Sequence, residues 1–345
     1  MISLSLKTKK FVKSIIATCM IALTIPSTSM ASNESFRFKI VNTDGNEDSP
    51  VGKSVQLWAE LLKKKSNGRM KTKVYHQGQL GSIGEVFDHM IKGNVDMILS
   101  QPLTSYDKRV GVMSLPYLFS NLEQAADAFE KDGWMTKIVD PLFADIGIKH
   151  FGPYPFGFGG VATKGRYARN YEQAQEMNLK VRTIPTFPNP QTVQAMGFHS
   201  VPLDWNEVYT SIQTGVVDGD SGNIIYWDYE YFGDQLDYFV HTKHLFSFSS
   251  LMMNKDTWDM LDEEDQQIIA SAAQEVIAKQ FKDAKAEDEM WIEKAQNDGM
   301  EYFEPSAEEL KSWMEPVREI VWREAEKEFG TQLMQRIRDN APDSQ

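Results

Sequence analysis

Hydrophobic and polar residues alternate along the first hundred positions in a way that predicts strands and helices in turn. The expected order is strand 36–41, helix 51–65, strand 71–75, helix 84–92 and strand 95–99. Strands and helices that alternate at these lengths predict a mainly parallel sheet with right-handed crossovers. The polar loops after the first and third strands, 42–50 and 100–107, would then lie at one edge of that sheet, where such folds bind ligands.

The remainder of the chain predicts a second α/β unit and two long helices. The expected elements are two helices in 121–147, strands in 148–163, a second α/β unit from Leu179, paired strands in 238–253 that return to the first domain, and helices over 262–298 and 307–329. The chain is expected to cross between domains near Gly157 and again near Phe246, so that two connections act as a hinge. The helix over 262–298 would be ~54 Å long, enough to span both domains.

These patterns predict an α/β protein of two discontinuous domains, with hinge strands and a long domain-spanning helix. About 310 residues after the leader exceed what one hydrophobic core normally serves. We expect a signal peptide over 1–31, a first domain over 32–157 plus 247–288, and a second domain over 158–246 plus 289–345.

The N-terminal segment has the three parts of a secretory signal. Lysines between Lys7 and Lys13 precede an apolar run over 15–25, and Ser29-Met30-Ala31 offers a small-x-small cleavage site. The apolar run is far shorter than the ~20 residues of a membrane span, so export to the periplasm is expected. A lipoprotein would need Cys19 as the acylated residue, but Cys19 lies inside the apolar run. Since Cys19 is the only cysteine, the mature protein would have no disulfide.

The charge balance narrows the choice of partners. The chain has 36 Lys and Arg against 49 Asp and Glu, and the leader would remove four of the lysines but no acid. A surface of this sign repels nucleic acid and anionic lipid, so neither is expected as a partner. An anionic ligand would have to be held locally against this field.

Arg182 is the strongest single candidate for such local binding. It ends the strand-like Leu-Lys-Val-Arg run that begins at Leu179, and the prolines from Pro185 onward close that strand. A guanidinium at a strand end faces the crevice where open α/β sheets bind ligands, and its planar fork suits a carboxylate. From the residues alone, Arg182 could equally pair with an acidic side chain of its own protein.

Three segments together resemble one protein family. The runs KVRT, VPLDWNEVYTSIQTGVVDGDSGN and LMMNKDTWDMLDEEDQQIIASAAQE are similar, in order and spacing, to the substrate-binding protein of a tripartite ATP-independent periplasmic (TRAP) transporter of the DctP type. The resemblance covers nearly all of the mature chain. It implies a periplasmic receptor that captures a small organic acid by hinge closure and delivers it to the membrane subunits of a permease driven by an ion gradient.

The resemblance also assigns residues. It implies that Arg182 holds the ligand's carboxylate and that Asn223 contacts the ligand, or that Gly222 fills that position if no residue is inserted. Many carboxylate-binding members carry a second arginine where this chain reads Gly157-Phe158-Gly159-Gly160. Its absence favours a ligand with one acidic group. An ectoine-like solute or a C4-dicarboxylate remains the alternative.

Aromatic and polar residues near predicted strand ends are the further candidates for ligand contact. Aromatic side chains there can stack on a ligand or face a cationic group, although each could equally belong to the core. The candidates are Phe187, Trp205, Trp227 and Phe158 as walls, and Asp44, Glu47 and Gln101 from the first domain.

The sequence supports a metal site, a cofactor site or an enzyme less well than it supports a solute receptor. Asp44, Asn46 and Asp48 have calcium-loop spacing, but Ser49 and Val55 occupy the positions that require Gly and Glu. His241 and His244 have no cluster of other ligands in the sequence. Neither a Gly-x-Ser-x-Gly motif nor a phosphate loop is found, and the Arg182 segment offers no acid or base. We therefore expect neither metal nor cofactor, and an exported carboxylate-handling enzyme is the less favoured rival.

Overall fold

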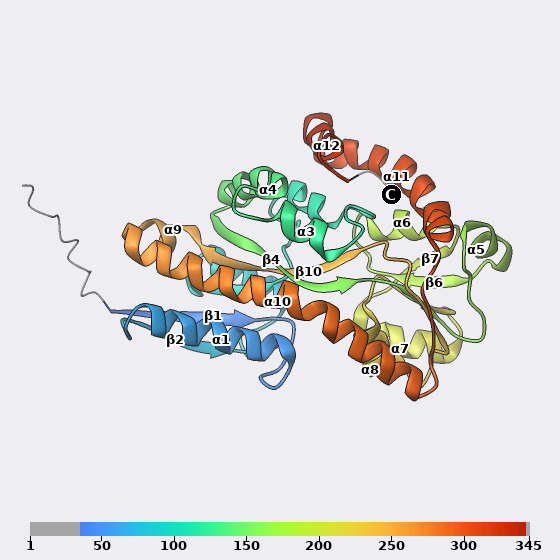
Figure 1. Cartoon of the computed structure of the whole chain (residues 1–345), viewed down its shortest axis with the longest axis horizontal. Coiled ribbons are helices and arrows are strands. Elements are labelled where there is room, and N and C mark those ends of the chain that lie inside the picture. Colours follow the sequence, from blue (N-terminus) through green and yellow to red (C-terminus); the bar gives the residue numbers. More distant parts are fainter. Residues whose placement is uncertain (1–34, 343–345) are drawn as a thin grey trace, which may run out of the picture. The chain divides into compact units, whose positions relative to one another are not determined.

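The structure is a computed structural model in which residues 35–342 are described. The predicted signal peptide over 1–31, with Cys19, lies outside the described residues. The described residues form two β-sheets with helices packed against them (Figure 1). The α/β fold class expected from the sequence is confirmed.

The first sheet has five strands in the order β2-β1-β3-β10-β4. Its strands are β1 (Phe36–Asn42), β2 (Met70–Tyr75), β3 (Met97–Ser100), β4 (Ile148–Phe158) and β10 (Phe246–Asn254). Strand β1 runs parallel to β2 and β3, as the βαβαβ pattern predicts, whereas β10 runs antiparallel to both β3 and β4. The sheet is therefore mixed rather than mainly parallel, because two long strands from later in the chain extend it.

The second sheet has six strands in the order β11-β9-β5-β8-β6-β7. Its strands are β5 (Val161–Thr163), β6 (Lys180–Thr183), β7 (His199–Pro202), β8 (Gly219–Ser221), β9 (Tyr238–Val240) and β11 (Glu301–Phe303). Strand β6 lies between β7 and β8 and is parallel to both. Their carboxyl ends therefore share one edge of the sheet, where ligand-binding loops are expected.

The predicted helices are present, and short helices that the periodicity did not predict are added over 108–114, 171–177, 255–259 and 331–338. In the N-terminal half the helices are α1 (Pro50–Lys65), α2 (Ile83–Ile91), the 3₁₀ helix η1 (Lys108–Ser114), α3 (Leu122–Ala128), α4 (Trp134–Asp145), α5 (Tyr171–Met177) and α6 (Asn189–Ala195). In the C-terminal half they are α7 (Trp205–Thr214), α8 (Ile225–Phe232), α9 (Lys255–Asp259), α10 (Glu263–Asn297), α11 (Ala307–Phe329) and α12 (Thr331–Arg338).

Two short chain connections join the sheets, in addition to the crossing made by helix α10. Strand β4 continues into β5 through Gly159 and Gly160, and β9 leads into β10 through residues 241–245. Strands β9 and β10 do not pair with each other, contrary to the expectation for 238–253, because the turn between them carries the chain from one sheet to the other. The two connections touch, since the Gly159 amide donates a hydrogen bond to the carbonyl of Leu245 at 2.8 Å.

Helix α10 crosses from one sheet to the other, as its length predicts (Figure 1). It begins where the Asp262 side chain accepts a hydrogen bond from the Asp265 amide, and it packs against α1 and β4 at one end and against α8 and β11 at the other. Helix α12 packs on α4, so the C-terminal residues contact elements of the first sheet. The domain boundaries given above stay a prediction.

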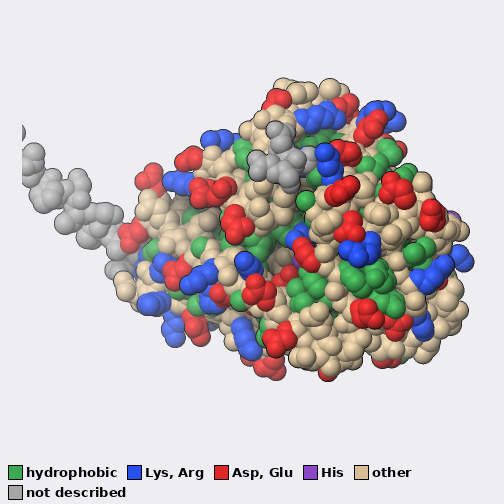
Figure 2. Space-filling view, turned by 45° about the vertical axis from the view of Figure 1, so that its right-hand side comes forward, with side chains coloured by type: hydrophobic (Ala, Val, Ile, Leu, Met, Phe, Trp, Pro, Cys, Tyr) green, Lys and Arg blue, Asp and Glu red, His purple; other side chains and the backbone are tan. Residues whose placement is uncertain are grey.

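The surface mixes both signs of charge. Figure 2 shows acidic and basic side chains interspersed over the displayed face, with hydrophobic side chains between them. Within residues 35–342, no helix combines the length and the apolar composition that a bilayer crossing requires.

Candidate functional site

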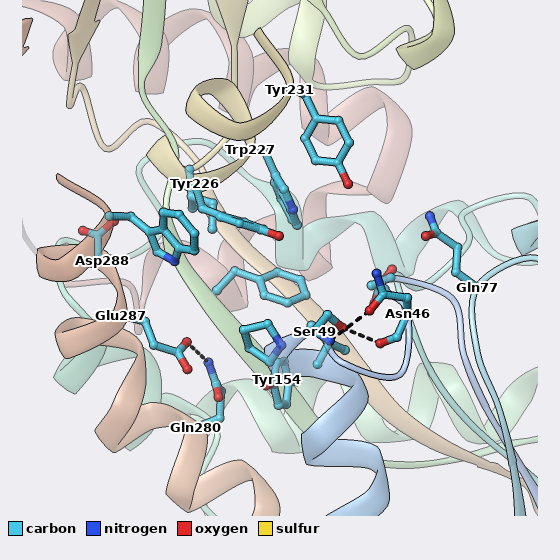
Figure 3. Close-up of a pocket in the computed structure, with 17 residues that line it drawn as sticks. Asn46, Ser49, Gln77, Tyr154, Tyr226, Trp227, Tyr231, Gln280, Glu287 and Asp288 are labelled. Atoms are coloured by element: carbon cyan, nitrogen blue, oxygen red, sulfur yellow. Dashed lines mark hydrogen bonds between the residues drawn. The ribbon is translucent and has the colours of Figure 1, made fainter. Parts of the chain in front are cut away.

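A cavity lies where the loop after β1, strand β4, helix α8 and the middle of α10 meet (Figure 3). The volume of this cavity is about 90 Å³. Its walls are formed by some of the residues in each of four segments, 44–51, 154–156, 224–231 and 280–291, and by Gln77. Elements of both sheets therefore contribute, which is the arrangement that a hinged binding protein needs.

Asp44 supplies a carboxylate to this cavity from the loop after β1. Ser249 on β10 donates a hydrogen bond to one oxygen of Asp44 at 2.6 Å, and the Thr43 hydroxyl lies 3.1 Å from the other. Burial raises the pKa of Asp44 to about 6, although these hydroxyl groups work in the opposite direction. At neutral pH this carboxylate is mostly ionised and poorly solvated, so a cationic partner would stabilise it.

Helix α10 adds two further carboxylates, Glu287 and Asp288. The Gln280 side chain donates to Glu287 at 3.1 Å and to the Pro155 carbonyl at 3.1 Å, so it fixes Glu287 against β4. Burial raises the pKa of Asp288, although the nearby His241 and Lys243 act in the opposite direction, and no hydrogen bond from a described residue reaches its carboxylate. Figure 3 shows Glu287 and Gln280 joined on the α10 side of the cavity.

Aromatic rings form much of the remaining wall. The rings of Phe156 and Trp227 meet edge to face with centroids 5.1 Å apart, and those of Tyr226 and Trp291 lie 4.6 Å apart. In Figure 3, Tyr226, Trp227 and Tyr231 descend from α8 onto the cavity. Ring faces carry negative potential, so these walls favour a cation as well as apolar surface.

The residues that line this cavity, all within the described part of the chain, include no Lys, Arg or His. Lys294 lies behind the wall, 4.5 Å from the Trp291 ring centroid. Lys294 is paired with Glu230 at 2.9 Å, so its charge is largely neutralised. The cavity is therefore acidic and aromatic.

Arg182 is the third residue of β6 and does not line this cavity. It is 3% exposed, and its Nη1 is 3.2 Å from Oδ1 of Asp220, which is fully buried on the adjacent strand β8. Its Nε donates to the Leu203 carbonyl at 2.9 Å, while its Nη2 makes no hydrogen bond to any residue between 35 and 342. The sequence left open whether Arg182 pairs with an acidic side chain of its own protein, and the structure shows that it does, because the β6–β8 pairing places Asp220 directly opposite Arg182.

Asn223 joins Asp220 to a second buried acid. Its amide nitrogen donates to Asp220 at 2.6 Å and to Asp228 at 2.9 Å. Burial, reinforced by the neighbouring Asp220, raises the pKa of Asp228 well above its usual range, and burial also raises that of Asp220 although Arg182 opposes it. The raised pKa favours the neutral form of Asp228, and the charge of Asp220 is paired with that of Arg182.

The comparisons with known proteins decide the family. The model for "bacterial extracellular solute-binding protein, family 7" matches residues 41–328. The chain belongs to this family. The ectoine-binding periplasmic protein TeaA of Halomonas elongata is 24% identical over 73% of this chain and 72% of its own length.

Solved structures agree with the family. A TRAP periplasmic solute-binding protein from Ochrobactrum anthropi is 26% identical, with a TM-score of 0.81 over 89% of this chain and 95% of that one. Another, from a Sulfitobacter species with bound β-D-galacturonate, is 26% identical, with a TM-score of 0.74 over 88% of this chain and 99% of that one. The resemblance to TRAP receptors is confirmed. The family and these neighbours are periplasmic binding proteins rather than enzymes, so the enzyme interpretation is excluded.

The candidates predicted from the sequence fall into three groups in this family member. Asp44 and Trp227 line the cavity. Asn223 and Trp205 belong to the surroundings of Arg182, since the Trp205 ring centroid is 5.8 Å from the guanidinium carbon. The others do not line the cavity: Phe187 packs against Phe329, Phe158 borders a separate hollow, and Glu47 and Gln101 are exposed.

The two histidines of the second connection are structural. His241 contacts the Tyr302 hydroxyl at 2.8 Å and Glu304 at 3.3 Å, and His244 contacts Thr242 at 2.7 Å. In the described part of the chain, no group of three or more potential ligands is placed to hold a metal ion.

Proposed function

We propose that this protein is the periplasmic receptor of a TRAP transporter, and that it captures a small organic solute by a single carboxylate. Family membership supports the receptor role. The single-carboxylate proposal rests on the position of Arg182 and Asn223. They lie near the carboxyl ends of β6 and β8, and Asn223 directly precedes the 224–231 segment that lines the aromatic cavity. Parallel strand ends of this kind are where α/β folds bind ligands.

Arg182 keeps a donor for that carboxylate in spite of its internal partner. Asp220 occupies Nη1, while Nη2 has no hydrogen bond to a described residue. The raised pKa of Asp220, caused by burial, means that a second carboxylate near Arg182 would favour protonation of Asp220. The guanidinium can then exchange an internal anion for the ligand with little net change of charge.

A single acidic group fits the space available. A side chain at Gly159 would place its Cβ 2.4 Å from the backbone oxygen of Gly222, so no arginine can stand there without moving the backbone. The cavity itself offers no cation to a second carboxylate. Ectoine and galacturonate, the ligands of two similar proteins, each carry one carboxylate. A C4-dicarboxylate is disfavoured on these grounds.

Closure about the two connections would couple binding to transport. A solute that touches both sheets favours the closed form, because a population shift requires differential contact. Closure also removes water, which strengthens the pairing with Arg182 in a lower dielectric. The closed form would be delivered to permease subunits driven by an ion gradient.

The test is a thermal-shift screen of matched mono- and dicarboxylates, followed by calorimetry on the best ligands. Preference for solutes with one carboxylate supports the proposal. Tighter binding of dicarboxylates, or of solutes without a carboxylate, contradicts the proposed anchor. Uptake by vesicles that contain the permease subunits should require both this receptor and an ion gradient, but no ATP.

A further inference from the structure

The charge of the cavity points to a feature of the solute that the carboxylate does not explain. Asp44 and Glu287 reach the cavity from two elements on opposite sides, the loop after β1 and helix α10, whereas Asp288 of α10 also borders a second hollow that contains His241 and Lys243. No Lys, Arg or His among the described residues lines the same space. A plain organic acid that entered would place apolar or anionic groups against the carboxylates of Asp44 and Glu287, and burying a carboxylate without a cationic partner is unfavourable.

The aromatic side chains of the cavity wall also favour a cationic group, independently of the carboxylates. Trp227, Tyr226 and Trp291 present aromatic rings to the cavity from α8 and α10. Such rings bind protonated and quaternary nitrogens through the negative potential of their faces, and tryptophan binds them best. Asp44 is held in place by hydroxyl groups of Thr43 and Ser249 but has no cationic partner of its own within the described residues.

The surroundings of Arg182 add a third argument. Because Asp220 already pairs with Arg182, the binding region as a whole has more anionic than cationic groups. A solute with one negative charge and no positive charge gains little from such a region. Neighbouring rings link the two ends, since the Tyr231 ring, which lines the cavity, has its centroid 5.4 Å from that of Trp205, and the Trp205 centroid lies 5.8 Å from the guanidinium carbon of Arg182.

We propose that the solute carries a cationic nitrogen, and that this nitrogen binds in the cavity between Asp44, Glu287 and the rings of Trp227 and Trp291. The inference rests on the proposed receptor function and specifies its substrate class: a zwitterion with an amine or a quaternary ammonium group, rather than a plain acid. The carboxylate end would lie toward Arg182 and the nitrogen end among the acids of α10 and the β1 loop.

Calorimetry with matched probes tests this directly. Glycine betaine and 3,3-dimethylbutanoate have the same shape and the same carboxylate, and they differ only in a charged nitrogen against a neutral carbon. Choline and 3,3-dimethylbutanol repeat that difference without the carboxylate. The same pairing is applied to longer homologues, γ-butyrobetaine and 5,5-dimethylhexanoate. We expect the nitrogen member of at least one carboxylate pair to bind ~10-fold or more tightly than its carbon member.

Variants assign the effect to the cavity. Asp44→Asn should lower the affinity for the nitrogen member ~10-fold and leave the carbon member unchanged, because only a cation loses its counter-charge. Asp48→Asn makes the same change of charge on an exposed side chain of the same loop, and it should leave both affinities unchanged. Glu287→Gln gives a second variant on another element, and melting temperatures show that each protein is folded.

The outcomes separate this inference from the receptor function. Equal or tighter binding of the carbon members overturns the inference, whereas the single-carboxylate receptor stands. Binding of choline without binding of any carboxylate supports the nitrogen site and contradicts the Arg182 anchor. If no nitrogen probe binds at millimolar concentration while organic acids stabilise the protein, the inference is overturned. An Asp44→Asn protein with unchanged selectivity also overturns it.

Discussion

Two buried acidic regions of this protein differ in how their charge is balanced. Around Asp220 the protein supplies its own cation, Arg182, and its own amide donor, Asn223. Around Asp44 it supplies only hydroxyl groups, and the carboxylates of α10 face the same cavity. A charge that is balanced internally contributes to the fold, whereas a charge left without its counter-charge at a cavity indicates what the ligand brings.

The largest expected effect is that of Arg182→Ala. Removal of a bidentate donor at a buried carboxylate site should weaken binding of the cognate solute ~100-fold or more. The same change leaves Asp220 buried without a cation, so the free energy of unfolding should fall by about 3–5 kcal/mol. Calorimetry and chemical denaturation measure the two effects.

Two controls sharpen that experiment. Arg166→Ala removes an exposed arginine and should change neither quantity. Adding Asp220→Asn to Arg182→Ala should restore much of the stability but none of the affinity. Wild-type affinity in the single variant would exclude Arg182 as the carboxylate anchor.

Asp220→Asn alone should have the opposite effect on plain acids. It removes the internal competitor and leaves Arg182 with an uncompensated positive charge, so 3,3-dimethylbutanoate should bind ~10-fold more tightly than to the wild type. The preference for nitrogen-bearing solutes should shrink in consequence. Unchanged or weaker binding of this anion would show that Asp220 does not limit access to the guanidinium.

The sequence predicts most of the fold but only part of the site, and the difference has a physical reason. Local periodicity located β1, α1 and the long helix α10 almost to the residue. The partner of Arg182 could not be found in this way, because Asp220 lies 38 positions later in a segment that reads as a turn, and only the pairing of β6 with β8 brings the two together.

Glu287, Asp288 and Trp291 were missed for a related reason. They belong to a helix that is polar along most of its length, and nothing in their spacing says which turn faces the cavity. That depends on how α10 packs against β4 and α8. Asp44, by contrast, was found because a polar residue directly after a predicted strand marks a strand end.

The raised pKa of Asp44 predicts a dependence of binding on pH. As the pH falls from about 7.5 to about 5, Asp44 gains a proton near pH 6 and loses its attraction for a cationic nitrogen, so binding of glycine betaine should weaken several-fold. Glu287, Asp288 and the tyrosines of the cavity face the same solute. Asp44→Asn should remove most of the dependence if Asp44 is the group that titrates.

The same shift has a consequence for folding with a defined sign. The pKa of Asp44 is higher in the folded state than in the unfolded chain, so the folded protein binds this proton more strongly. Its contribution to the free energy of unfolding should therefore rise as the pH falls through about 6 toward about 4. Denaturation of wild type and Asp44→Asn across this range isolates the contribution. If the free energy of unfolding of the wild type, relative to that of Asp44→Asn, increased with increasing pH, the raised pKa of Asp44 would be contradicted.

Glu287→Gln should produce the smallest effect of the series. Its carboxylate is partly exposed and is fixed by Gln280, so loss of its charge removes a screened attraction rather than a buried pair. We expect a ~3-fold loss of affinity for the nitrogen-bearing probe and no change for the carbon isostere. Glu293→Gln changes an exposed charge two turns further along the same helix and should affect neither probe. If Glu287→Gln weakened both probes equally, Glu287 would shape the cavity without sensing charge, and Asp44 and Asp288 would be left as the counter-charges of the nitrogen.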